Sequence, residues 1–177
     1  MEFVLKVNHL KKSYGKQKAL TDITFSVRSG SCFGLLGPNG AGKSTTMKII
    51  TGIVEADGGV AKLFGLNAVK QRHAISRKIG YVPQAITLYE KLSAHDNLTF
   101  FGEMYGLHGN YLKQRINEVL ELVGLANKAK AAVRTFSGGM KRRINMAAAM
   151  LHYPELLILD EPTVGIDPQS RNHIFEM

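Results

Sequence analysis

A run of small residues from Gly37 to Thr45 fits the pattern G-x-x-x-x-G-K-[ST] at every fixed position. The apolar run 32–36 precedes it and predicts a buried strand, and residues 45–50 predict the start of a helix. Glycines let the backbone N–H groups approach an anion closely, and a helix N-terminus adds a favourable dipole. The sequence therefore predicts a phosphate-binding loop formed by Gly37, Pro38, Asn39, Gly40, Ala41, Gly42, Lys43, Ser44 and Thr45.

Two side chains of this loop would contact the ligand. Lys43 would bring a positive charge to the β- and γ-phosphates of a nucleotide, and the Ser44 hydroxyl would ligate the accompanying magnesium ion. The alternative is a glycine-rich turn that binds nothing. We favour the nucleotide site, because a chance match in a chain of this length has a probability on the order of 1%.

Two acidic residues, Asp160 and Glu161, follow the aliphatic run 156–159, which predicts a strand buried on both faces. A strand lying beside the one that leads into the phosphate loop would deliver Asp160 to the magnesium ion through a water molecule. Glu161 would lie one step further, where it could orient a water molecule or accept its proton. An acidic turn after a strand is common, so this assignment depends on the phosphate loop upstream.

A second glycine-containing stretch, Ser137-Gly138-Gly139, predicts the start of a helix with Ser137 as its N-cap. The basic residues Lys141, Arg142 and Arg143 follow in the first turn, where cations oppose the helix dipole. Two interpretations are considered: an anion lies nearby, or the turn is basic and solvated and its side-chain stems pack on neighbours. We favour the anion, because the stretch accompanies the other motifs.

The composition suits one folded domain, with 177 residues, of which 45% are hydrophobic. The formal net charge of +9 is compatible with nucleic acid, an anionic membrane surface or a nucleotide, or with solubility alone. The one cysteine, Cys32, is predicted to be a buried apolar residue in a reducing compartment. No apolar run approaches the roughly 20 residues of a membrane helix, so a membrane role would require a partner chain or a segment not present here.

The remaining pattern predicts strands and helices around these motifs. Strands are expected at 3–10, 20–27, 60–64 and 79–82, and the second would direct Ile23, Phe25 and Val27 to one face. A short helix is expected at 68–76. From Ser93 to Val123 the spacing predicts two helices separated at 106–110. Ser93 would cap the first of them, with Asp96 at the position where a capping box prefers glutamate. A further helix is expected at 137–151.

Together the motifs resemble the nucleotide-binding subunit of an ATP-binding cassette (ABC) transporter, over essentially the whole chain. In that family's terms, 37–45 resembles the Walker A loop, 156–160 the Walker B strand and 136–140 the signature sequence, usually L-S-G-G-Q. Phenylalanine replaces its leucine and methionine its glutamine, and Lys-Arg-Arg follows, which looks most like the drug- and polysaccharide-export branch. Met140 cannot make the hydrogen bonds of a glutamine. We therefore expect the action of this motif on the phosphate to be weakened rather than lost.

The resemblance implies an α/β fold: a P-loop NTPase core with a mixed sheet, an antiparallel β-subdomain and an inserted helical subdomain. In a single ABC ATPase domain over 1–177, residues 1–83 and 154–177 would form the core with the β-subdomain. Residues 84–153 would form the helical insert that carries the signature. Since 16 residues follow Glu161, it also implies a C-terminal truncation, with the last strands and the family's switch histidine missing. We interpret His173 as an ordinary helix histidine.

The resemblance also assigns roles to residues outside the Walker motifs. Tyr14 would stack on the adenine, and Gln84 would sense the γ-phosphate and help to ligate magnesium. Residues Thr163 to Asp167 resemble the D-loop, in which Val164 replaces a usually small residue. The implied catalytic residues are Lys43, Gln84 and Glu161. The implied magnesium ligands are Ser44, Gln84 and Asp160. The implied caps of a γ-phosphate bound to a second cassette are Ser137, Gly138 and Gly139.

By this resemblance the chain is an ATPase that uses ATP and Mg²⁺ to power a membrane transporter, with exporter as the expected type. Its partners would be a second nucleotide-binding subunit, identical or not, and a transmembrane permease that holds it at the cytoplasmic face of the membrane. The insert, with 88–92 near its edge, would meet the permease. No nucleic-acid partner is expected. Two alternatives remain: a soluble cassette ATPase acting on nucleic acid or ribosomes, and a nucleotide-binding module with little turnover.

Overall fold

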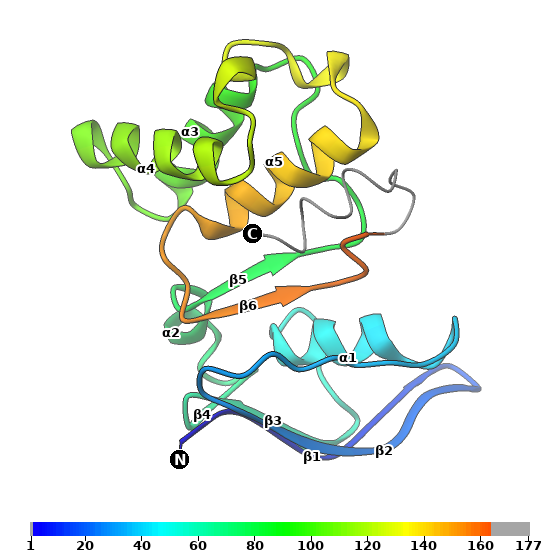
Figure 1. Cartoon of the computed structure of the whole chain (residues 1–177). Helices are drawn as coiled ribbons and strands as arrows, with labels where there is room; N and C mark the ends of the chain where they lie inside the picture. Colours follow the sequence, from blue (N-terminus) through cyan, green and yellow to red (C-terminus); the bar gives the residue numbers. More distant parts are fainter. Residues whose placement is uncertain (1, 164–177) are drawn as a thin grey trace. The chain divides into compact units, whose positions relative to one another are not determined.

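The computed structural model describes residues 2–163 of the chain. The chain divides into two compact units, Met1–Ile79 and Gly80–Met177, and each is described by itself (Figure 1). Most of the expected D-loop, from Val164 to Asp167, lies outside the described residues, as does His173.

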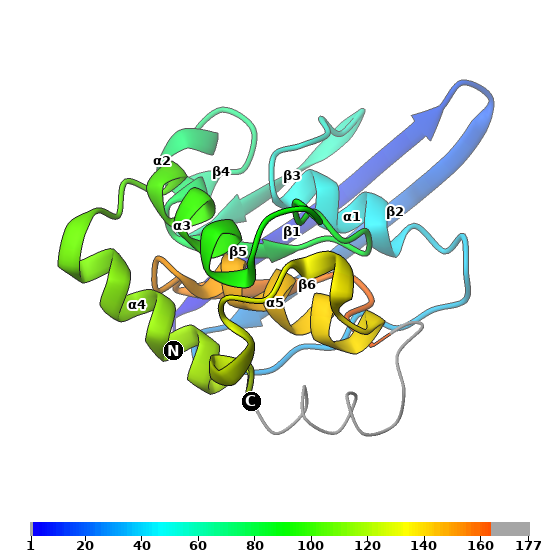
Figure 2. The same cartoon turned by 90° about the horizontal axis from the view of Figure 1, so that it is seen from above.

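The first unit contains a four-stranded sheet in the order β2-β1-β3-β4, in which every pairing is antiparallel. Its strands are β1 (Phe3–Tyr14), β2 (Gln17–Arg28), β3 (Gly58–Leu63) and β4 (Leu66–Asn67). Figure 2 shows β1 and β2 as a long hairpin. The strands expected at 3–10, 20–27 and 60–64 are therefore confirmed, and the first two extend further toward their connecting turn.

One face of this sheet is apolar and buried. Val7 of β1 pairs with Phe25 of β2 and with Ala61 of β3, and Val7 and Ala61 are both buried. The alternation along β2 is confirmed, since Val27 is buried and Ile23 and Phe25 are half-buried between exposed neighbours.

The unit also contains helix α1 (Lys43–Ile50) and helix α2 (Arg72–Ser76). Only the last part of the helix expected at 68–76 is therefore helical.

The segment expected to form a buried strand at 32–36 is neither strand nor helix, so this prediction was wrong. Leu36 is 93% exposed, and Phe33 is exposed except where its ring stacks on Phe25 at 5.0 Å. Cys32, expected in the core, is also exposed. A strand needs a hydrogen-bonded neighbour, and among residues 2–163 no strand pairs with this segment.

The second unit contains the two-stranded sheet formed by β5 (Ile79–Val82) and β6 (Leu156–Leu159). Both strands were predicted, and Figure 1 draws their arrows in the same direction. All four residues of β6 are half-buried, so the expectation of burial on both faces was wrong. The side chains of Leu157 and Leu159 pack against Val82 and a helix of this unit, and only β5 pairs with the strand among the described residues.

Three helices and two short 3₁₀ turns complete the described part of this unit. They are α3 (Ala94–Met104), α4 (Gly109–Leu122), η1 (Ala126–Lys128), η2 (Val133–Thr135) and α5 (Gly138–Met150). The three α-helices confirm those expected within 93–123 and 137–151. They share one apolar core, in which Leu98 of α3, Ile116 of α4 and Ile144 of α5 are at most 1% exposed.

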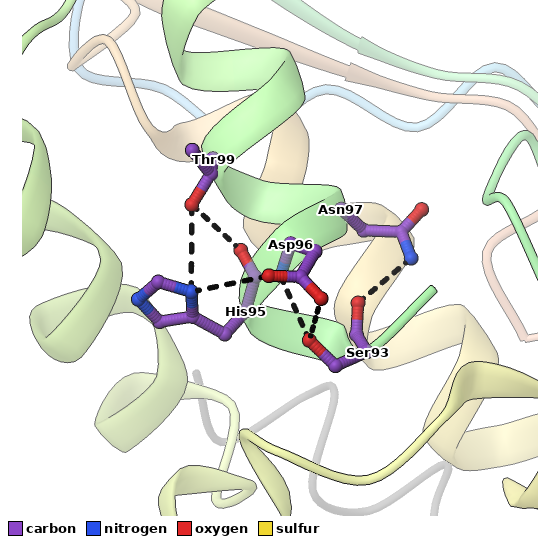
Figure 3. Close-up of polar contacts among 5 residues, drawn as sticks. All are labelled: Ser93, His95, Asp96, Asn97 and Thr99. Carbon is purple, nitrogen blue, oxygen red and sulfur yellow. Dashed lines mark hydrogen bonds and ion pairs between the residues drawn. The ribbon is translucent and has the colours of Figure 1, made fainter. Parts of the chain in front are cut away.

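The N-terminus of α3 is capped as the sequence predicts (Figure 3). The Ser93 hydroxyl accepts a hydrogen bond from the Asp96 amide at 3.0 Å and donates one to the Asp96 carboxylate at 2.7 Å. The Asn97 side chain donates to the Ser93 carbonyl at 2.9 Å, and Thr99 donates to the His95 carbonyl at 3.0 Å. These bonds fix the start of α3 and the direction in which the preceding loop enters it.

Candidate nucleotide site

The phosphate loop of the first unit has the local geometry that the motif requires. Gly42 has φ +85° and forms the N-cap of α1, which begins at Lys43. A Cβ at Gly42 would lie 2.4 Å from the Leu20 side chain and 2.5 Å from the Ala19 carbonyl oxygen. This position therefore requires glycine both for its backbone conformation and for the space around it.

The Lys43 side chain folds back over the loop. Its ammonium donates hydrogen bonds to the carbonyl oxygens of Gly37 at 2.9 Å and Pro38 at 3.1 Å. The Ala41 amide donates to the same Pro38 carbonyl at 3.1 Å and closes a turn within the loop. The ammonium thus lies against the loop backbone, with α1 starting at the same residue, and both features favour an anionic ligand.

Tyr14, the expected adenine-stacking residue, ends β1 and is 50% exposed. The adjoining backbone is held in place, because the Ser13 amide donates to the Asp57 carboxylate at 2.7 Å and Lys12 forms an ion pair with it at 2.7 Å. The hydrogen bond from Lys12 lowers the pKa of Asp57, with the bond from Ser13 adding to the effect. An exposed ring on a fixed backbone could stack on a base, which remains a prediction.

In the second unit the ends of β5 and β6 bring three of the expected residues together. The Asp160 amide donates to the Val82 carbonyl at 2.9 Å, and the Asp160 residue is 2% exposed. The Gln84 side-chain amide donates to a carboxylate oxygen of Glu161 at 2.9 Å. Glu161 has φ +50°, a left-handed conformation that is costly for a residue with a side chain.

The signature stretch opens helix α5 as expected. Ser137 is the N-cap, and its hydroxyl accepts a hydrogen bond from the Met140 amide at 3.2 Å. Ser137 and Gly138 are exposed, and Gly139 is buried. The residues expected to cap a γ-phosphate therefore lie at a helix N-terminus with two of the three open to solvent.

The three cations after the signature are held by protein groups. Lys141 forms an ion pair with Glu90. Arg143 donates to the Val123 carbonyl at 2.8 Å, and Arg142 donates to two main-chain carbonyls described below. The sequence favoured an anion beside these side chains, whereas these contacts favour the alternative, in which they pack on neighbouring protein groups.

Arg142, which the sequence singled out only as one of three basic residues after the signature, is a functional candidate by its contacts. It is only 5% exposed and donates to the Pro83 carbonyl at 2.9 Å and the Gln84 carbonyl at 2.7 Å. Burial lowers the pKa of Arg142, and the negative charge of Asp160 opposes that shift. Burial raises the pKa of Tyr81, and Asp160 raises it further. The available signal was the run of three basic residues after the signature, in which Arg142 is the fifth residue of α5.

The expected magnesium ligands are divided between the units. Ser44 lies in the first unit, whereas Gln84 and Asp160 lie in the second. A hydroxyl, a carboxylate and an amide oxygen are hard donors of the kind that magnesium prefers, so these residues fit the ion chemically. Within residues 2–163 no group of three or more His, Cys, Asp or Glu side chains could hold a metal by itself. No helix there is long and apolar enough to cross a membrane.

Sequence comparison identifies relatives over nearly the whole chain. The family model described as "ABC transporter" matches residues 20–164. A linearmycin resistance ATP-binding protein of Bacillus subtilis is 56% identical over 98% of this chain and 56% of its own length. A Nod factor export ATP-binding protein I of Ralstonia nicotianae is 42% identical over 98% of this chain and 54% of its own length. A bacitracin transport ATP-binding protein of Bacillus licheniformis is 43% identical over 95% of this chain and 54% of its own length.

The chain spans about half the length of these curated relatives. Among solved structures, an ATP-binding subunit of an ABC transporter matches with a TM-score of 0.85 and 34% identity, over 98% of this chain and 72% of that one. The protein cbiO1 of Clostridium perfringens, part of the transporter complex cbiONQ, matches with a TM-score of 0.87 and 27% identity, over 99% and 72%. The expected fold class and the likeness to drug- and polysaccharide-export proteins are thus confirmed, and the chain belongs to the ABC transporter family.

Proposed function

We propose that this chain is the ATP-binding and ATP-hydrolysing part of a subunit that powers a membrane exporter. The observation that carries the proposal is the phosphate loop, in which Lys43, the first residue of α1, donates to the carbonyls of Gly37 and Pro38. Relatives that are named for antibiotic resistance, antibiotic transport and Nod factor export support export as the direction.

In the proposed reaction a water oxygen attacks the γ-phosphorus, the bond to the β-phosphate oxygen breaks, and ADP and phosphate leave. Lys43 moves its hydrogen bonds from the loop carbonyls to the β- and γ-phosphates, and Tyr14 stacks on the adenine. Glu161 accepts the proton of the attacking water, and Gln84 releases that carboxylate when it turns to the γ-phosphate. Magnesium, held by Ser44, Gln84 and Asp160, would neutralise phosphate charge.

A second copy of this cassette, or a similar one, completes the proposed site. The exposed Ser137 and Gly138 at the start of α5 offer a hydroxyl and a helix N-terminus to the γ-phosphate of the partner. A permease would hold the pair at the cytoplasmic face of the membrane. The exposed apolar side chains of Ile86, Tyr89 and Leu92 support a contact with such a partner beside the insert.

The test compares the binding of Mg-ATP to the unaltered chain, to Lys43→Ala and to Lys48→Ala, by fluorescence of a labelled nucleotide. Lys48 lies in the last turn of the same helix and is exposed, so it controls for charge and for folding of α1. We expect Lys43→Ala to weaken binding at least tenfold and Lys48→Ala to leave it within twofold. Equal affinity of Lys43→Ala and the unaltered chain would remove the central support of the proposal.

A further inference from the structure

The segment 83–92, here called the Gln84 loop, has no regular secondary structure, yet buried polar side chains hold its backbone at several points. It begins after β5 with Pro83 and Gln84 and ends before the cap of α3. A loop without its own hydrogen-bond ladder depends on such contacts for a defined conformation. The inference below rests on the proposed function, because it concerns how Gln84 and Glu161 are positioned for hydrolysis.

The first contact comes from Arg142 on α5. One nitrogen of its guanidinium donates to the Pro83 carbonyl at 2.9 Å and the other to the Gln84 carbonyl at 2.7 Å. The planar group matches two adjacent carbonyls, as it would match two oxygens of a carboxylate. The 5% exposure of Arg142 means that solvent cannot easily replace these bonds.

The second contact comes from Asn145, one turn further along the same helix face. Its side-chain oxygen accepts hydrogen bonds from the Thr87 hydroxyl at 2.8 Å and from the Thr87 amide at 3.2 Å. Asn145 is 3% exposed. Helix α5 therefore holds the Gln84 loop at two points, one on each side of Ala85 and Ile86.

The third contact comes from Asn97 on α3, which is fully buried. Its oxygen accepts from the Tyr89 amide at 2.7 Å, and its nitrogen donates to the Tyr89 carbonyl at 3.0 Å. The same nitrogen bonds the Ser93 carbonyl in the cap of α3 (Figure 3). The far end of the loop is thus held by the helix that follows it, which leaves Arg142 as the contact nearest to Gln84.

We propose that Arg142 is a positioning residue for ATP hydrolysis, which fixes the backbone from which the Gln84 side chain reaches Glu161. Because Arg142 lies on α5, it also ties the Gln84 loop to the helix that carries Ser137, so that both move together. Arg142 touches neither substrate nor metal in this proposal. Its effect on the reaction passes through Gln84, whose side chain donates to Glu161 at 2.9 Å before it turns to the γ-phosphate.

The guanidinium of Arg142 carries a positive charge and also forms a fork that bonds two carbonyls, and substitutions can separate these two properties. Arg142 is a buried cation whose charge interacts with the buried carboxylate of Asp160. Lysine at this position would keep the charge near Asp160 but lose the fork that spans two carbonyls. Methionine would keep much of the apolar stem and lose both. If geometry carries the effect, lysine can restore only part of what methionine removes.

The experiment measures steady-state ATP hydrolysis and Mg-ATP affinity for Arg142→Met and Arg142→Lys, with Arg134→Met as the matched control. Arg134 is an exposed arginine of η2. We expect Arg142→Met to lower kcat at least tenfold while nucleotide affinity stays within twofold, and Arg142→Lys to recover part of the loss. Arg134→Met should behave as the unaltered chain does.

A double-mutant cycle with Gln84→Ala separates positioning from a general loss of structure. If Arg142 acts through Gln84, its replacement should change kcat by less than twofold once Gln84 is alanine. An equal loss of kcat in both backgrounds would overturn the inference. If thermal unfolding shows that Arg142→Met is not folded, Arg142→Lys takes its place in the cycle. Failure of the unaltered chain to bind Mg-ATP would instead refute the proposed function.

Discussion

Replacing Gly42 by alanine places a methyl group where the structure leaves no room for one. The added Cβ would lie 2.4 Å from the Leu20 side chain and 2.5 Å from the Ala19 carbonyl oxygen, and the backbone has φ +85°. Leucine can move, but the carbonyl is part of the main chain of strand β2 and has less freedom than a side chain. The loop, rather than the sheet, would therefore have to shift, and α1 would shift with it.

The expected cost has two parts. A left-handed conformation costs alanine about 1–2 kcal/mol relative to glycine. Forcing a methyl group into occupied space costs about 1–3 kcal/mol more. We therefore expect Gly42→Ala to lower the free energy of unfolding by about 2–5 kcal/mol. Nucleotide affinity should fall as well, since Lys43 and the first turn of α1 follow Gly42 directly.

The matched control is Gly30→Ala. Gly30 also has a left-handed backbone, with φ +70°, but nothing lies within 4 Å of its added Cβ. Urea unfolding followed by circular dichroism would compare the two variants. Gly30→Ala should lose only the conformational part, about 1–2 kcal/mol, and keep its nucleotide affinity. Coincident unfolding curves for the two variants would show that the close contact at Gly42 does not govern stability.

Two further perturbations test the polar contacts of each unit. Asn97→Ala should lower the free energy of unfolding by about 1–3 kcal/mol for each main-chain group of Tyr89 left unsatisfied, whereas the exposed Asn127→Ala should leave the urea midpoint unchanged. Asp57→Asn should destabilise the chain near neutral pH, because Lys12 lowers the pKa of Asp57 from 3.8 in the folded state. A carboxyl whose pKa is lower in the folded state stabilises the fold at pH values above its unfolded-state pKa, and acidification removes this stabilisation. The free energies of unfolding of Asp57→Asn and the unaltered chain should therefore converge below pH 3.8. A constant difference from neutral to acidic pH would contradict that assignment.

The features that the sequence predicted correctly are those determined by neighbouring residues. The glycines around Lys43, the Ser93 cap with Asp96 and the Ser137 cap all depend on residues within a few positions of one another. Helical spacing also located α3, α4 and α5, because burial of one face of a helix repeats along the chain. Local pattern was therefore sufficient for the helix starts and for the helices, whereas nucleotide binding at the loop stays a prediction.

The segment 32–36 shows where local pattern fails. Its apolar residues favour a strand, but a strand also needs a partner at hydrogen-bond distance, and no strand within 2–163 provides one. The same reasoning explains β6, whose residues are half-buried with β5 as their one described neighbour. The placement of Cys32 was wrong for this reason, since its burial was inferred from the strand.

The basic residues after the signature required information that spacing does not contain. A cation in the first turn of a helix opposes the dipole at a cost of about 0.3–1 kcal/mol. Arg142 is the fifth residue of α5, just past that turn, and charge-assisted hydrogen bonds to two carbonyls hold it there, each bond contributing about 1.5–3 kcal/mol. Those acceptors, Pro83 and Gln84, are 59 and 58 positions away in the chain. Basic residues near a helix start therefore need an acceptor, and only the fold decides whether that acceptor is a ligand or the backbone of a loop.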